Sequence, residues 1–105
     1  MMYTVSFNVP PATLAAITAQ ANQMRISRAH LVREAVAFTA ANYDKAIARL
    51  IELNKPLDMN RSPTSYTLDN TTTETLKRIS EVVGVSKDTI LKTSIDYYIS
   101  CQKLD

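Results

Sequence analysis

The chain has 105 residues, of which 46% are hydrophobic, and this is enough for one compact domain with one core. It contains one glycine and four prolines, which argues against disorder and against a glycine-rich phosphate loop. The formal net charge of +2 is only mildly basic, so neither binding to nucleic acid nor its absence follows from charge alone.

Single copies of two reactive residue types exclude several kinds of site. Cys101 has no second cysteine for an internal disulfide, and His30 is the only histidine. We expect Cys101 to be a buried thiol and His30 a surface or packing residue, both on helices. No catalytic constellation, metal-ligand spacing or nucleotide loop is visible, so we predict no enzyme, no cofactor and no small-molecule substrate. The chain has no signal peptide and no apolar run near 18 residues, which predicts a soluble, cytoplasmic protein without a membrane partner.

Two stretches, residues 3–10 and 62–69, have the two-residue alternation of a half-buried strand. We expect them to pair with each other, and because two strands alone are not stable, helices must cover one face. The other face should be open, and we name it the outward face. Its polar residues are Thr4, Ser6 and Asn8 from the first stretch and Ser65 and Thr67 from the second.

The first strand is followed by two helical patterns. Pro10 and Pro11 suit the opening of a helix, and apolar residues at helical spacing predict a helix over residues 11–24. Ser27 is a good N-cap for a second helix. The first unit is thus a strand, a helix, a short turn and a helix, over residues 1–42.

Residues 43–61 connect this unit to the rest of the chain. The apolar stripe of the second helix continues as far as Asn54, so either that helix runs on or a short extra helix follows it. Residues 56–63 contain two prolines and are typical of an extended connector.

The same order of elements returns in residues 62–105. Asp69 or Asn70 can cap a helix, Gly84 suits the end of that helix, and Ser86 can cap the last one. A shift of 59 residues aligns the two units without a gap, so that Ser27 matches Ser86 and the apolar positions of the helices coincide. We therefore predict two tandem units that share one core.

With these features the chain resembles the ribbon-helix-helix family of DNA-binding proteins, the MetJ/Arc/CopG group, in two copies. The resemblance covers about residues 1–42 and 62–101, and it rests on the alternating strands, the helix openings and the turns between helices. In the family, glycine, an aliphatic residue and serine commonly form this turn, and Gly84-Val85-Ser86 matches. The first turn has Arg25 instead of glycine, and a non-glycine residue at positive φ costs on the order of 1 kcal/mol. We therefore expect the first turn to bend differently.

The resemblance implies a mainly α fold with a two-stranded antiparallel ribbon, arranged as a tandem ribbon-helix-helix pseudo-dimer. It also implies that the ribbon enters the major groove of double-stranded DNA and that the outward face contacts base edges. The residues predicted to contact bases are Thr4, Ser6, Asn8, Ser65 and Thr67.

Basic residues accompany the start of the second helix in each unit. We name Arg25, Ser27 and Arg28 the first basic start, and Ser86 and Lys87 the second basic start. A helix N-terminus favours anions, and the resemblance implies that DNA phosphates bind at both starts. In the alternative interpretation the two serines are only helix caps and the basic residues are solvated. Arg33 and Lys92, which lie further along, are expected to be plain surface charges.

The predicted function is therefore sequence-specific binding of double-stranded DNA as a transcriptional repressor, of the kind that plasmids and phages encode. Self-association of chains along DNA is a further expectation. Two alternatives stay open. One is an accessory DNA-binding protein of a plasmid-transfer relaxosome, with the tandem TraY-like arrangement, and the other is a protein-interaction or antitoxin-type module, in which residues 43–60 would bind the partner.

Overall fold

The computed structural model describes residues 2–42 and 62–103. The order of elements is β1 (Met2–Val9), α1 (Pro11–Met24), α2 (Arg28–Ala41), β2 (Ser62–Asp69), α4 (Asn70–Val83) and α5 (Lys87–Lys103). The described part of the chain is thus mainly helical with one two-stranded antiparallel sheet, as the sequence predicts. None of these helices is both long and apolar enough to cross a membrane. The connector predicted over residues 43–61 lies outside the described residues.

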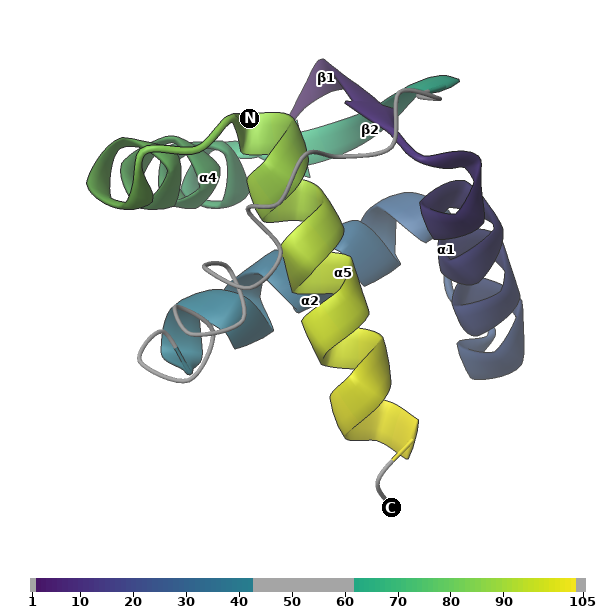
Figure 1. Ribbon diagram of the computed structural model, residues 1–105. Helices are drawn as coiled ribbons and strands as arrows, with labels where there is room; N and C mark the ends of the chain where they lie inside the picture. Colours follow the sequence, from purple (N-terminus) through teal and green to yellow (C-terminus); the bar gives the residue numbers. More distant parts are fainter. Residues whose placement is uncertain (1, 43–61, 104–105) are drawn as a thin grey trace.

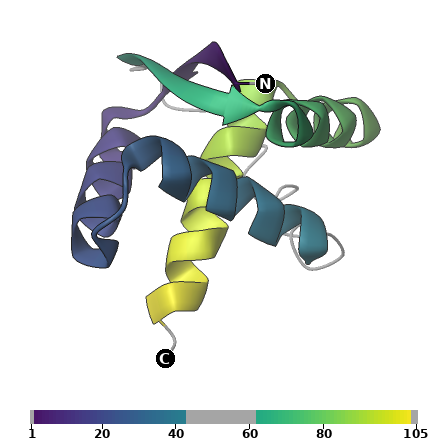
Figure 2. The ribbon, with the colours of Figure 1, turned by 180° about the vertical axis from the view of Figure 1, so that it is seen from behind.

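The two strands form a ribbon on one side of the molecule, and α2 and α5 cross beneath it (Figure 1). Helices α1 and α4 lie at opposite ends of this arrangement, which Figure 2 shows from behind. Helix α2 packs against β2 and α5 against β1, while α2 and α5 make the most extensive contact between helices. One face of the ribbon is therefore covered and the other is open.

Alternation along both strands divides the ribbon into a buried and an exposed face. In the antiparallel register Ser6 pairs with Ser65, and Phe7 pairs with Thr64. The side chains that face the helices include Phe7, Val9, Tyr66 and Leu68, and all four are buried. All five residues of the outward face are exposed. The predicted orientation of both strands is confirmed.

The core combines residues from both strands and all four described helices. Its largest fully buried side chains are Phe7, Ile17, Leu31, Leu68, Leu76, Ile90, Leu91 and Ile95, together with Val9, Val32 and Val36. These residues form one contiguous cluster. Because α5 packs on β1 and α2 packs on β2, each strand contacts a helix from the other half of the sequence, and the two halves share their buried surface.

The helices begin where the sequence predicts, and their caps explain why. Pro10 is extended, with φ −60° and ψ 146°, and Pro11 opens α1. Asp69, rather than Asn70, caps α4 by accepting the N–H of Thr72 at 3.0 Å. The serines of the two basic starts cap α2 and α5 in the same way.

Helix α2 ends at Ala41. The next residue, Asn42, has φ −117° and ψ 37°, and its N–H bonds to the carbonyl of Phe38 at 3.1 Å. The side-chain amide of Asn42 donates to the same carbonyl at 2.9 Å, so this oxygen accepts two hydrogen bonds at the end of the helix. Both alternatives for the apolar stripe after Asn42 concern residues outside the described part of the chain.

The turns that join the paired helices have the same handedness, in contrast to the expectation for Arg25. Arg25 has φ 58° and ψ 42°, and Gly84 has φ 81° and ψ 28°, so both residues are left-handed. After Arg25, the N–H of Ile26 bonds to the carbonyl of Ala21 at 3.0 Å, which closes the end of α1. Arg25 thus has the turn conformation that is typical of glycine, and the folded protein contains the backbone strain of a non-glycine residue at positive φ.

This turn leads to a prediction on stability. Arg25→Gly should raise the free energy of unfolding by about 0.5–1 kcal/mol, because glycine adopts positive φ without a steric penalty. The matched control is Gly84→Ala, where a Cβ would meet no atom within 4 Å, so that only backbone strain is introduced. It should lower stability by about the same amount. Urea midpoints at constant slope measure both changes, and a destabilised Arg25→Gly protein would contradict this account.

Candidate nucleic-acid interface

The outward face of the ribbon is polar and uncharged at its centre. Ser6 and Ser65 lie opposite each other there, and their hydroxyl oxygens are hydrogen-bonded at 3.1 Å. One donor is used in this bond, so the pair keeps one hydroxyl hydrogen and several lone pairs for another partner. Thr4 pairs with Thr67 on one side of this centre, and Asn8 pairs with Pro63 on the other.

The first basic start lies beside β2. A hollow of about 320 Å³ separates the beginning of α2 from the strand, and it is lined by Ser27, Arg28, Ala29 and residues 64–67. The side chains of Arg25 and Arg28 are exposed. A polar hollow that is lined by Arg28 at a helix N-terminus is suited to an anion that also touches the ribbon.

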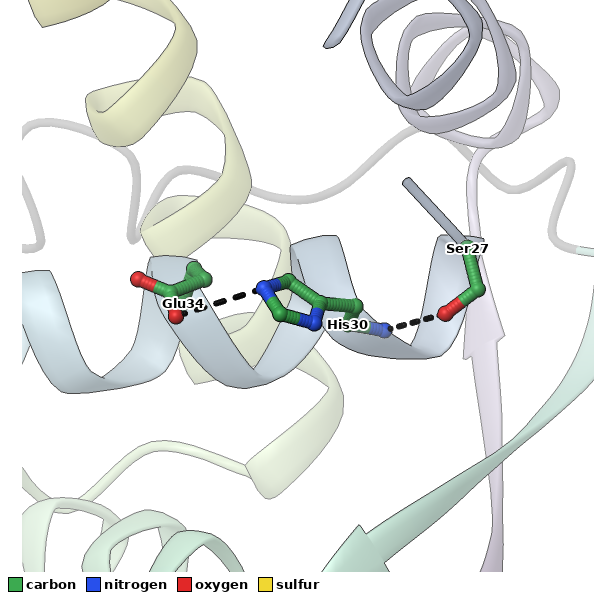
Figure 3. Close-up of polar contacts among 3 residues, drawn as sticks. All are labelled: Ser27, His30 and Glu34. Atoms are coloured by element: carbon green, nitrogen blue, oxygen red, sulfur yellow. Dashed lines mark hydrogen bonds and ion pairs between the residues drawn. The ribbon is translucent and has the colours of Figure 1, made fainter. Parts of the chain in front are cut away.

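Ser27 itself is a helix cap. Its hydroxyl oxygen accepts the N–H of His30 at 3.0 Å, as Figure 3 shows. The imidazole of His30 points along α2 toward Glu34, with Nε2 at 3.4 Å from Oε1. Both side chains are about half exposed, so His30 is the helix-surface residue that the sequence predicts. Its ring is directed away from the cap.

The second basic start is followed by an acidic residue that the first lacks. Ser86 caps α5 by accepting the N–H of Thr89 at 3.2 Å, and Lys87 is exposed. The next residue is Asp88, whose Oδ1 accepts the backbone N–H of Asn8 at 3.2 Å. The 59-residue shift matches Asp88 with Ala29, which lines the hollow at the first start. A carboxylate therefore lies beside Lys87, whereas a methyl group lies beside Arg28.

Arg33 and Lys92 are not the plain surface charges that the sequence led us to expect. Arg33 Nη1 donates to the carbonyl oxygen of Thr67 at 2.9 Å, and this bond joins α2 to β2. Lys92 Nζ forms an ion pair with Asp96 Oδ2 at 2.7 Å within α5, and both side chains are mostly buried. Sequence reasoning missed the roles of Arg33 and Asp88, since no local pattern indicates a contact with a strand from the other half of the chain.

Two ionisable groups near these elements have shifted pKa values. Hydrogen bonds from the hydroxyl and N–H of Thr72 lower the pKa of Asp69, and the charge of Arg33 adds to this effect. Burial raises the pKa of Tyr98, and Glu34 raises it further. Asp69 therefore stays ionised at neutral pH as the cap of α4, and Tyr98 stays neutral in the core.

The described residues hold no group of three or more His, Cys, Asp or Glu side chains that could bind a metal ion. Cys101 is half-buried on α5, less buried than expected. The candidate interface consists of the outward face of the ribbon and the two basic starts. Comparison of this chain with protein-family models gives no match, and comparisons with curated proteins and with solved structures give none either.

Proposed function

We propose that this protein binds double-stranded DNA in a sequence-specific manner, as a tandem ribbon-helix-helix pseudo-dimer that acts as a transcriptional repressor. One observation carries the proposal: a two-stranded ribbon exposes a face of hydroxyl and amide side chains, and basic helix starts accompany it. The major groove of B-DNA is wide enough for such a ribbon, and its base edges offer donors and acceptors that these side chains can bond.

Contacts between matched residues support the pseudo-dimer. In a two-fold dimer, residues near the axis contact their own copies. In this chain Ser6 bonds to Ser65, and the rings of Phe38 and Tyr97 lie 5.3 Å apart, tilted by 47°. The rings of Phe7 and Tyr66 lie 6.5 Å apart, again between residues separated by 59 positions. Three such contacts, on the ribbon and between the helices, are what two fused copies around one axis would make.

The basic starts supply the second part of the proposed mechanism. Phosphate contacts position a protein on DNA, and base contacts select the sequence. A ribbon in the groove brings the flanking helix starts toward the two backbones, where the free N–H groups of the first turn and the basic side chains can bind phosphate oxygens. Capping by Ser27 and Ser86 orders these turns and leaves the basic side chains exposed.

The two halves should not bind phosphate equally. Asp88 places a negative charge next to Lys87 in the sequence, while the matched residue Ala29 places none next to Arg28. Repulsion between the carboxylate and a phosphate weakens the second start. We therefore infer an oriented complex in which the first basic start provides the stronger backbone contact. A relaxosome accessory protein would use the same surface, so the DNA-binding experiments below apply to that role as well.

Removing single basic side chains tests the phosphate contacts. Arg28→Ala and Lys87→Ala should weaken binding to all duplexes and should each lower the slope of log K against log salt by about one. Sequence preference should be retained, because phosphate contacts carry no base information. The loss of affinity should be larger for Arg28→Ala, since Asp88 already offsets part of the Lys87 charge. Fluorescence anisotropy at several salt concentrations measures both quantities.

The matched control is Lys103→Ala, at the end of α5 opposite to its basic start. The slope of log K against log salt for this variant should equal that of the wild type, because the C-terminal end of α5 lies on the far side of the molecule from the ribbon (Figure 1). If Arg28→Ala and Lys87→Ala also kept the wild-type slope and affinity, both basic starts would be ordinary solvated helix ends.

A further inference from the structure

Both edges of a two-stranded ribbon carry backbone N–H and C=O groups that no neighbouring strand can pair. In this protein a side chain from a helix bonds to one such group on each strand. Arg33 of α2 donates to the carbonyl of Thr67 at 2.9 Å, and Asp88 of α5 accepts the N–H of Asn8 at 3.2 Å. The ribbon is thus attached to the helices at two backbone points.

These two points are matched positions of the outward face. The 59-residue shift relates Asn8 to Thr67, and both side chains are exposed. Each is held by a helix from the opposite half of the chain, because α2 holds β2 and α5 holds β1. The two helix side chains have opposite charges and opposite hydrogen-bonding roles. The guanidinium group of Arg33 donates to a backbone carbonyl, whereas the carboxylate of Asp88 accepts a backbone N–H.

A backbone contact at a recognition residue affects where its side chain points. Productive recognition requires side chains to be held within about 0.5 Å of the required geometry by supporting hydrogen bonds. The side chains of Asn8 and Thr67 are exposed, so packing of these side chains cannot supply this restraint. The bonds from Arg33 and Asp88 restrain the peptide groups to which these side chains are attached.

We propose that Arg33 and Asp88 are positioning residues for base recognition, with Arg33 acting through Thr67 and Asp88 through Asn8. This inference rests on the proposed DNA-binding function and assigns to each half of the ribbon its own determinant of specificity. Neither residue needs to touch DNA. Loss of Arg33 should relax the preference in one half-site only, and loss of Asp88 should relax it in the other.

The chain contains its own control for Arg33. Lys92 matches Arg33 under the 59-residue shift, but its ammonium group binds Asp96 at 2.7 Å. Lys92→Met removes the same charge from the matched helix position without removing a contact to the ribbon. For Asp88, the conservative change Asp88→Asn keeps an oxygen that can accept the N–H of Asn8, whereas Asp88→Ala removes it.

The test is selection of the full chain against a randomised pool of duplex DNA. Selection with the wild type defines the preferred sequence, and selection with Asn8→Ala and Thr67→Ala identifies the base pairs that depend on each residue. Arg33→Met should then reduce the preference at the base pairs assigned to Thr67 by roughly three- to tenfold, as expected for one lost hydrogen bond. It should leave the base pairs assigned to Asn8 unchanged. Lys92→Met should alter neither set, and Arg33→Lys should restore part of the preference.

Asp88→Ala should reduce the preference at the Asn8 base pairs by a similar factor, and Asp88→Asn should retain most of it. In the double variant Arg33→Met with Thr67→Ala, the loss of sequence preference at the base pairs assigned to Thr67 should equal the loss in Thr67→Ala alone. The reason is that Arg33 acts on these base pairs only through Thr67. Thermal unfolding of each variant separates these effects from a loss of folded protein.

A merely structural role would reduce binding to every duplex equally, and that result would overturn the proposal. Unchanged preference in Arg33→Met and Asp88→Ala, with a wild type that does select a sequence, would also overturn it while leaving the DNA-binding function intact. A wild type that selects no sequence would refute the proposed function, and the positioning roles with it.

Discussion

Phe7→Ala should lower the free energy of unfolding by about 3–5 kcal/mol and leave a single cooperative transition. Phe7 is 1% exposed, and its ring lies 6.5 Å from that of Tyr66 on the other strand. Its removal opens a cavity where the ribbon meets helices from both halves of the chain. Urea unfolding followed by far-UV circular dichroism and by tyrosine fluorescence should give coincident curves, because the buried residues of the described part of the chain form one cluster.

The control for this variant is Met2→Ala on the same strand. Met2 is 49% exposed, so its truncation should change stability by no more than about 0.5 kcal/mol. Two separate unfolding steps in Phe7→Ala, with one half of the chain still folded, would contradict the shared core. The two halves would then have to be regarded as independent domains.

Local patterns were sufficient to predict the elements of this fold. The alternation around Phe7 and Tyr66 fixed which side of each strand is buried, because a period of two leaves no other orientation. Pro10, Ser27 and Asp69 marked helix starts correctly, since a cap acts through groups within three or four residues of it. The exposure of the outward face followed from the same alternation. Each of these features depends on neighbours in the sequence, and that is why the sequence predicts them.

The conformation of Arg25 could not be predicted in this way. An arginine avoids positive φ by itself, so local preference indicated a different turn. The structure has the glycine-type turn because α1 and α2 must both bury their apolar sides, and Ile26 packs against the core cluster. Burial of several side chains outweighs about 1 kcal/mol of backbone strain.

The contacts of Arg33 and Asp88 were also beyond sequence reasoning. Each joins a helix of one half to a strand of the other, across 34 residues for Arg33 and 80 for Asp88. Lys92 has the same charge as Arg33 and the matched position, yet its partner is Asp96, one helical turn away. Which of two partners a basic side chain takes depends on distances in the folded chain. The specificity that we assign to Arg33 and Asp88 is thus a property of the tertiary structure.

Asn8 is the residue of the outward face with the greatest capacity to distinguish bases. Its side-chain amide can donate and accept at once to a single adenine, whereas the four other residues offer one hydroxyl each. Its position is matched by Thr67 under the 59-residue shift, and Thr4 is matched by Pro63, which is exposed and has no hydrogen-bonding side chain. The two half-sites should therefore differ in sequence, and the preferred site should depart from a perfect palindrome.

Asn8→Ala should cost about 1–3 kcal/mol of binding free energy on the preferred duplex and much less on an unrelated duplex, the range for one bidentate base contact. Stability should be unchanged, because the side chain is exposed and Asp88 still accepts the backbone N–H. Ser6→Ala and Thr67→Ala should act in the same direction but more weakly, since each removes a single hydroxyl. Competition binding with both duplexes measures the difference. Equal losses on the two duplexes would mean that the ribbon does not recognise bases, and a protein partner would become the better explanation for its exposed polar face.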